Sequence, residues 1–279
     1  MDRREAFQRL AAEAGRGELN FPTHAEVAMR VRLALDDPDI HISAAARLVQ
    51  AEPLLAARVV AVANSVAFNR SGRAIADVGH AVARLGFQLV RALATAVVMR
   101  QMAGGSKVPR FREMSARLWE HTAHVASLAH VIARRVTRQD PEVALFAGIV
   151  HEVSGFYLLS RADSYPSLLE EGDLVEWEEE GEATVGRAVL KVLKVPDNVV
   201  TAIESIWQGY LALPPVSLGD TMLLADALTP IDSPLRAKGE DTRVGIRASI
   251  DVAVGEETLT SILAESAEEL ESLTSALHF

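Results

Sequence analysis

The chain has 279 residues, of which 49% are hydrophobic and 24% are charged, and it contains no cysteine. This length and composition are typical of a globular protein with one large or two modest domains, and they exclude a disordered or collagen-like chain. The lack of cysteine excludes disulfides, thiolate-bound zinc, iron–sulfur clusters and cysteine nucleophiles, so any metal must be held by nitrogen and oxygen ligands.

The net charge of −10 is unevenly distributed. Residues 170–182 carry eight acids and no base, and residues 251–279 carry seven more acids and no base. These segments would repel a phosphate backbone, and no basic stripe with interleaved aromatic residues is present. We therefore expect no nucleic-acid partner, and we interpret residues 170–182 as a solvated loop.

The first five residues lack the apolar core of a signal peptide. The longest uncharged apolar stretch, residues 92–99, is far shorter than the roughly 20 residues that a membrane span needs. These features predict a cytoplasmic protein without a membrane partner.

Helical apolar spacing recurs along the chain, and no set of alternating strand-like runs bounded by hairpin turns is found. The fold class is therefore predicted to be all-α. A capping box at Thr23–Glu26 predicts a helix to about residue 35, and Pro53 predicts the first turn of a helix that ends at Asn64–Ser65. Asp77 can cap a helix through Leu85, with Gly86 separating it from a second helix to Met102.

The stretch 104–109 combines a glycine pair, a polar residue and a proline between two long helical patterns, which makes it the best internal boundary. Beyond it the spacing predicts helices over 111–136, 141–159, 182–193, 197–207 and 218–228. Residues 230–245 are polar and contain proline and glycine, which predicts a loop.

The last predicted helix, residues 256–277, has heptad spacing on one face. This face is formed by Leu259, Leu263, Ser266, Leu270, Leu273 and Leu277. A helix docked on its own chain and a homodimer through the C-terminal helix both fit the pattern.

Phosphate-binding glycine loops and the nucleophile elbow of α/β-hydrolases are missing from the sequence. Histidines, in contrast, are concentrated between residues 80 and 151. His121 and His124 are spaced i, i+3 on one helix, and His151–Glu152 adds an imidazole and a carboxylate on the next. Divalent ions accept such ligands, but histidines in alanine-rich helices also serve as ordinary packing residues.

An ordered series of short motifs resembles the HDOD domain over about residues 20–230. The N-terminal part of the series comprises Glu52–Ser65, Ile75 and Ala81–Gly86. The second part comprises Trp119, His121–Thr122, Val125–Ala126, Ala129, Ala147–Glu152, Gly186, Pro196, Ile203 and Ala225–Asp226.

The resemblance implies an HD-like helical domain in two helical subdomains with an extra C-terminal helix. In residue terms it predicts a lead-in helix in 1–20, an N-terminal subdomain over 21–106, a degenerate HD-like subdomain over 107–230 and an acidic extension over 231–279.

HDOD domains are similar to the HD and HD-GYP phosphohydrolases, in which a His, a His-Asp pair and a distant Asp hold a divalent ion that activates water. Carried onto this chain, the resemblance implies His121, His151, Glu152 and Asp226 as candidate metal ligands, with a glutamate where the pair has an aspartate.

Other positions depart from the pattern of these relatives. Glu182 stands where a further histidine is expected, Ile206–Trp207 where a histidine pair is expected, and Ser154–Gly155 where Gly-Lys or Gly-Arg is usual. A second metal would lose its imidazoles, and a cation for developing phosphate charge is missing. A two-metal phosphodiesterase is therefore not expected.

From the resemblance and these losses we predict a non-catalytic bacterial signal-transduction module, which acts through protein partners and needs no cofactor. The four candidate ligands would then form a buried hydrogen-bonded network. The alternative is a mononuclear phosphohydrolase with one divalent metal ion. A third possibility is a partner-docking surface on residues 170–182 or on the terminal helix.

Overall fold

The computed structural model describes residues 3–19, 25–37, 39–103, 105–165, 168, 177–236 and 256–278. Every regular element within these residues is a helix, and none of them forms a strand. The predicted all-α fold class is confirmed.

The N-terminal helices are α1 (Arg3–Gly15), α2 (Glu26–Ala34), α3 (Ile42–Gln50), α4 (Pro53–Asn64) and α5 (Val78–Ala103). Helix α2 ends close to residue 35 as predicted, and its N-cap is Ala25 without a side-chain cap, whereas the predicted cap Thr23 lies outside the described residues. Helix α4 begins as predicted, because Pro53 takes its first turn and the Glu52 carboxylate accepts a hydrogen bond from Leu55 N at 2.5 Å. Helix α3 was not predicted.

Helix α5 is long but not straight. It bends at Gly86, which has φ 74° and ψ 164°, a backbone conformation open to glycine and strained for other residues. Its start is capped by Asp77, whose Oδ1 accepts a hydrogen bond from His80 N at 2.8 Å. Both the cap and the break predicted at Gly86 are confirmed.

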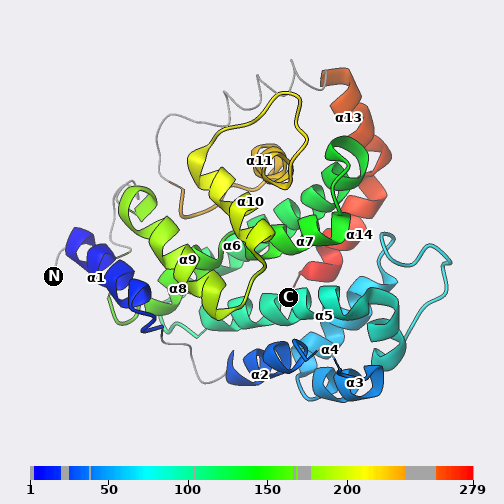
Figure 1. Ribbon diagram of the computed structural model, residues 1–279, viewed down its shortest axis with the longest axis horizontal. Helices are drawn as coiled ribbons and strands as arrows, with labels where there is room; N and C mark the ends of the chain where they lie inside the picture. The colour runs from blue at the N-terminus through cyan, green and yellow to red at the C-terminus, as the bar shows by residue number, and fades with distance from the viewer. Residues whose placement is uncertain are drawn as a thin grey trace.

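The second half comprises α6 (Pro109–Ile132), which continues as the π-helical turn η2 (Ala133–Thr137), then α7 (Pro141–Val150), α8 (Val153–Arg161), α9 (Glu182–Val192), α10 (Asp197–Gln208) and α11 (Leu218–Leu228). Figure 1 shows α2, α3 and α4 on one side of α5, and α6, α7, α10 and α11 on the other.

The single helix predicted over 141–159 is wrong. The chain turns between α7 and α8 at Glu152, whose φ of −94° and ψ of 20° are not helical. The apolar spacing continues on both sides of this turn, because both helices are buried, and it therefore hides the break. As a result, His151 and Glu152 lie at a helix junction instead of within one helix.

The acidic run was predicted to be a solvated loop, and residues 169–176 lie outside the described residues. For residues 177–181 the predicted loop is wrong, because they form the π-helical turn η4 (Trp177–Gly181), although Glu178 and Glu179 are exposed as predicted. Trp177 is buried, and its ring lies 5.6 Å from that of Phe7 on α1. The indole of Trp177 therefore packs the C-terminal end of the acidic segment against α1.

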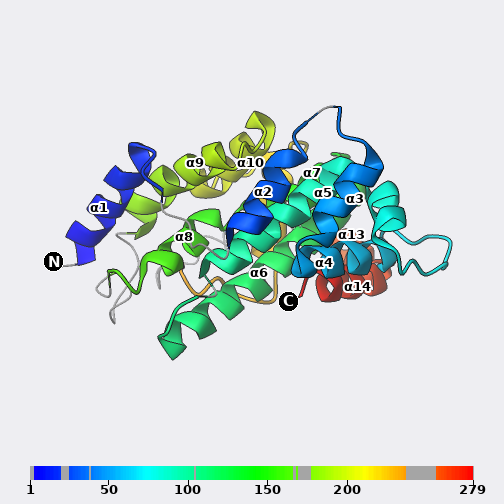
Figure 2. The same cartoon turned by 90° about the horizontal axis from the view of Figure 1, so that it is seen from below.

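The C-terminal segment forms two helices, α13 (Glu256–Glu265) and α14 (Ala267–Leu277), which meet at Ser266. Figure 2 shows α14 beside α4. Trp119 Nε1 donates to Leu277 O at 3.0 Å, and Arg58 donates to Ala276 O at 3.1 Å. The heptad face is covered within the chain, since Leu259, Leu273 and Leu277 are buried in its core. The predicted docking on the chain itself is confirmed, although as two helices instead of one, and the possible homodimer through the C-terminal helix stays a prediction.

Glu269 of α14 gives this docking a pH dependence. Burial favours its neutral acid, but contacts with His130 and Arg134 outweigh burial and lower its pKa to about 2. A lowered folded-state pKa adds stability that is present above the unfolded pKa of 4.5 and is lost as pH falls toward 2. We expect Glu269→Gln to lower the free energy of unfolding by about 1–2 kcal/mol at pH 7 and to have little effect near pH 2.

Urea denaturation at both pH values measures this effect. Glu268→Gln is the matched control, because Glu268 is exposed on the same helix. An equal loss of stability in E269Q at both pH values would contradict the ion-pair explanation.

One buried apolar cluster takes residues from both predicted subdomains, and α5 reaches α7 and α8 across the boundary. The predicted subdomain limits stay a prediction. Two stretches, Val78–Ala103 and Pro141–Arg161, are long and apolar enough to cross a membrane, but 67% and 89% of their apolar windows are buried inside the protein, as in core helices. That is weak evidence for a membrane, and the expectation of no membrane partner also stays a prediction.

Candidate functional site

The four candidate ligands come together from three parts of the fold. His121 lies in the middle of α6, His151 and Glu152 lie at the α7–α8 junction, and Asp226 lies near the end of α11. All four are buried, with exposed fractions of 0, 5, 8 and 6% in that order. His124, the i+3 neighbour of His121, is only half-buried and lies outside this group.

His121 Nε2 is the centre of the cluster. It lies 3.2 Å from His151 Nε2, 3.5 Å from Asp226 Oδ1 and 3.7 Å from Glu152 Oε1. Ligand atoms of His121, His151 and Glu152 therefore lie within 4.8 Å of one another, and Asp226 adjoins His121.

Two backbone carbonyls accept hydrogen bonds from the Nδ1 atoms of the imidazoles. His121 Nδ1 lies 2.7 Å from Ile231 O, and His151 Nδ1 lies 2.7 Å from Gly148 O. Because a carbonyl can only accept, each Nδ1 carries a proton, and each Nε2 faces the cluster, where its unprotonated form can bind a metal ion. Burial lowers the pKa of His121, and the neighbouring His151 lowers it further against the opposing effects of Glu152 and Asp226.

This arrangement fits a single divalent cation. His121, His151 and Glu152 each offer one ligand atom within 4.8 Å of the others. Ligands about 2.1 Å from a tetrahedral ion are about 3.4 Å apart, close to the distances measured from His121 Nε2. The hydrogen bonds from both Nδ1 atoms to carbonyls are the kind that orient metal-binding histidines.

Glu182 and Trp207 occupy two of the positions at which the sequence departs from the pattern of its relatives. Burial raises the pKa of Glu182 to about 8, with the carboxylates of Glu152, Glu178 and Asp226 adding to the effect. Trp207 packs on α9, because a β-carbon at Gly186 would lie 2.7 Å from its ring. An indole therefore stands where the resemblance leads us to expect metal-binding imidazoles.

Sequence reasoning missed three groups of the site. Arg236 Nη2 lies 2.7 Å from Asp226 Oδ2 and forms an ion pair with it. The other two are the carbonyls of Ile231 and Gly148. A lone arginine ten positions after Asp226 follows no spacing rule, and a carbonyl acceptor leaves no mark in a sequence.

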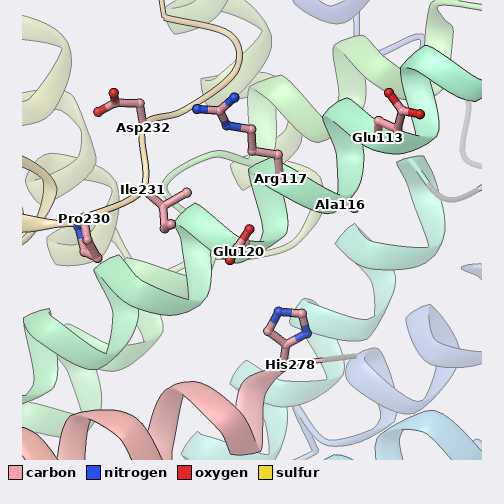
Figure 3. A pocket seen from close by; sticks show the side chains of 8 residues that line it. All are labelled: Glu113, Ala116, Arg117, Glu120, Pro230, Ile231, Asp232 and His278. Atoms are coloured by element: carbon pink, nitrogen blue, oxygen red, sulfur yellow. The ribbon is translucent and has the colours of Figure 1, made fainter.

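An open groove of about 630 Å³ lies on the outer side of the segment that follows α11. Figure 3 shows Pro230, Ile231 and Asp232 on one side of this groove, α6 on another and His278 at its end. Ile231 belongs to both regions, since it lines the groove and its carbonyl accepts the hydrogen bond from His121.

Comparisons with known proteins agree with this fold. The family model of the HDOD domain matches residues 21–208. A crystal structure from Shewanella amazonensis SB2B, named "Putative metal-dependent phosphohydrolase", is 24% identical with a TM-score of 0.73, and the match covers 98% of each chain.

Two further crystal structures are similar. An "HDOD domain protein with unknown function" from Geobacter sulfurreducens is 24% identical with a TM-score of 0.58, over 98% of this chain and 97% of the other. A "Putative signal transduction protein" from Marinobacter aquaeolei VT8 is 19% identical with a TM-score of 0.57, over 99% of this chain and 66% of the other. A search of curated proteins gave no match. At these identities the structures establish the fold alone.

Proposed function

Because the chain belongs to the HDOD domain family, we propose that it is a regulatory module of bacterial signal transduction, which acts through protein partners and does not hydrolyse phosphate esters. A cytoplasmic location and the absence of nucleic-acid partners are part of the same proposal. One similar structure is named as a signal transduction protein, which supports the regulatory role.

The observation that carries the non-catalytic part is the closure of the cluster. No more than 8% of any of the four residues is exposed, so a phosphate ester would have to open the protein to reach them. Trp207, which packs on Gly186, and Glu182 stand where the resemblance implies histidines for a second ion. A phosphoryl-transfer site needs room for the ester and cations against its developing charge.

The cluster nevertheless fits one divalent cation, which His121, His151 and Glu152 would hold. Such an ion, when bound, supplies Lewis acidity and lowers the pKa of water. The chain's own groups do the positioning: the carbonyls of Ile231 and Gly148 orient the two imidazoles, and the burial of the cluster excludes bulk water.

The protein-partner part is supported by the loop between α10 and α11. Tyr210, Leu213 and Val216 on this loop have exposed fractions of 77, 53 and 60%. Large apolar side chains grouped on a surface are typical of protein contact sites.

A mononuclear metal-dependent phosphohydrolase is the second candidate. The convergence of the side chains on His121 Nε2 favours it, because nitrogen and oxygen atoms that can serve as metal ligands lie 3.2, 3.5 and 3.7 Å from this atom.

Assays of the metal-loaded protein distinguish the two functions. The purified chain is loaded with Mn²⁺, and its metal content is measured by mass spectrometry. Hydrolysis of cyclic dinucleotides and phosphomonoesters is then followed for wild type and His151→Ala. We expect the two proteins to give the same rate as the buffer with Mn²⁺. Turnover by wild type that is lost in H151A would establish the phosphohydrolase instead.

A further inference from the structure

The segment Thr229–Arg236, which we name the strap, connects the end of α11 to the buried cluster at several points. Leu235 is buried against α8, because a β-carbon at Gly155 would lie 2.5 Å from its Cδ1 and 3.0 Å from Glu152 Oε2. Ile231 O accepts the hydrogen bond from His121 Nδ1. The strap is therefore packed beside two of the candidate ligands.

The last residue of the strap brings a positive charge to the cluster. Arg236 Nη2 lies 2.7 Å from Asp226 Oδ2. Burial alone would lower the pKa of Arg236, but Asp226, Glu152 and Glu178 outweigh burial and raise it. Arg236 in turn opposes the raised pKa of Glu182. The guanidinium of Arg236 thus offsets the negative charge of neighbouring carboxylates, which would otherwise repel one another.

We propose that Arg236 is the cation that neutralises this cluster and that it competes with a divalent metal ion for Asp226, whose Oδ1 lies 3.5 Å from His121 Nε2. This inference rests on the cation pocket described under the proposed function. A divalent ion beside His121 Nε2 would face the guanidinium at short range, and the two positive charges would repel. Arg236 therefore sets whether the pocket is neutralised by the chain itself or by a metal.

The strap lies beyond residue 208, where the HDOD match ends. If Arg236 competes with metal, displacement of the strap from the cluster is expected to raise the affinity of the pocket for metal.

The affinity of the protein for Mn²⁺ tests the proposal, and this measurement does not depend on catalytic activity. Mn²⁺ is titrated into the metal-free full chain by calorimetry for wild type and Arg236→Gln. We expect R236Q to bind Mn²⁺ at least about tenfold more tightly, because it removes the competing charge. Arg187→Gln is the matched control, since Arg187 forms an exposed ion pair with Glu204 at 2.5 Å and is expected to leave the affinity unchanged.

A second variant covers the case in which R236Q does not fold. Because the raised pKa of about 8 keeps Glu182 largely protonated near neutral pH, the double variant R236Q/E182Q changes the charge of the cluster as R236Q does, and it removes an acid whose ionisation would no longer be offset by Arg236. It is also expected to bind Mn²⁺ more tightly than wild type. Binding that is equal or weaker than wild type in the folded variant, or binding by neither protein, overturns the inference. Hydrolysis by wild type would contradict the proposed function but would leave this comparison of affinities unchanged.

Discussion

Gly148→Ala is expected to lower the free energy of unfolding by about 3 kcal/mol or more. A β-carbon at Gly148 would lie 2.4 Å from Ala126 Cα and 2.9 Å from Ala126 N. Both atoms are backbone, so the substitution must separate α6 from α7 and cannot be absorbed by a rotamer change. Because His121 lies on α6 and His151 follows α7, the separation would also pull the two imidazoles apart.

Urea denaturation monitored by circular dichroism measures this loss. Gly15→Ala is the control, because a β-carbon at Gly15 meets nothing within 4 Å. We expect G15A to stay within about 0.5 kcal/mol of wild type. If G148A were as stable as G15A, the close approach of α6 and α7 would not hold in solution.

Asp220→Asn is expected to cost about 2–4 kcal/mol, because one buried carboxylate organises the whole loop between α10 and α11. Its Oδ1 accepts from Ala212 N at 2.9 Å, and its Oδ2 accepts from Val216 N at 3.0 Å and from Ser217 N at 2.8 Å. An amide offers only one acceptor oxygen, so its NH₂ group would face backbone donors on one side.

Stability and amide hydrogen exchange over residues 209–217 measure this effect together. Asp197→Asn is the control, since Asp197 also lies in the first turn of a helix but is exposed. We expect D220N to speed exchange throughout the loop and D197N to leave it unchanged. Unchanged exchange in D220N would show that other contacts hold the loop that displays Tyr210 and Leu213.

Much of the fold could be predicted from apolar spacing and helix caps. The turn at Gly86 and the start of α4 at Pro53 follow from the backbone chemistry of single residues. The break at Glu152 could not be predicted in this way, because α7 and α8 are both buried and show no change in pattern where they meet. Periodicity reports which face is buried, and it fails where every face is buried.

The site was predictable only through family motifs. Spacing pointed equally to His121 and His124, and the structure brings only the first into the cluster. The motifs selected His121, His151, Glu152 and Asp226, which do meet, but they could not supply Arg236. The ion pair between Asp226 and Arg236 depends on the three-dimensional path of the irregular segment after α11, which the spacing of residues does not predict.

Anomalous diffraction from crystals of the full chain soaked in Mn²⁺ tests most directly whether the pocket has room for one cation. The account predicts a single peak bounded by His121, His151 and Glu152, stronger in R236Q than in wild type. Two peaks about 3.5–4 Å apart, with the second beside Glu182 and Trp207, would instead show an intact two-metal centre and contradict the account.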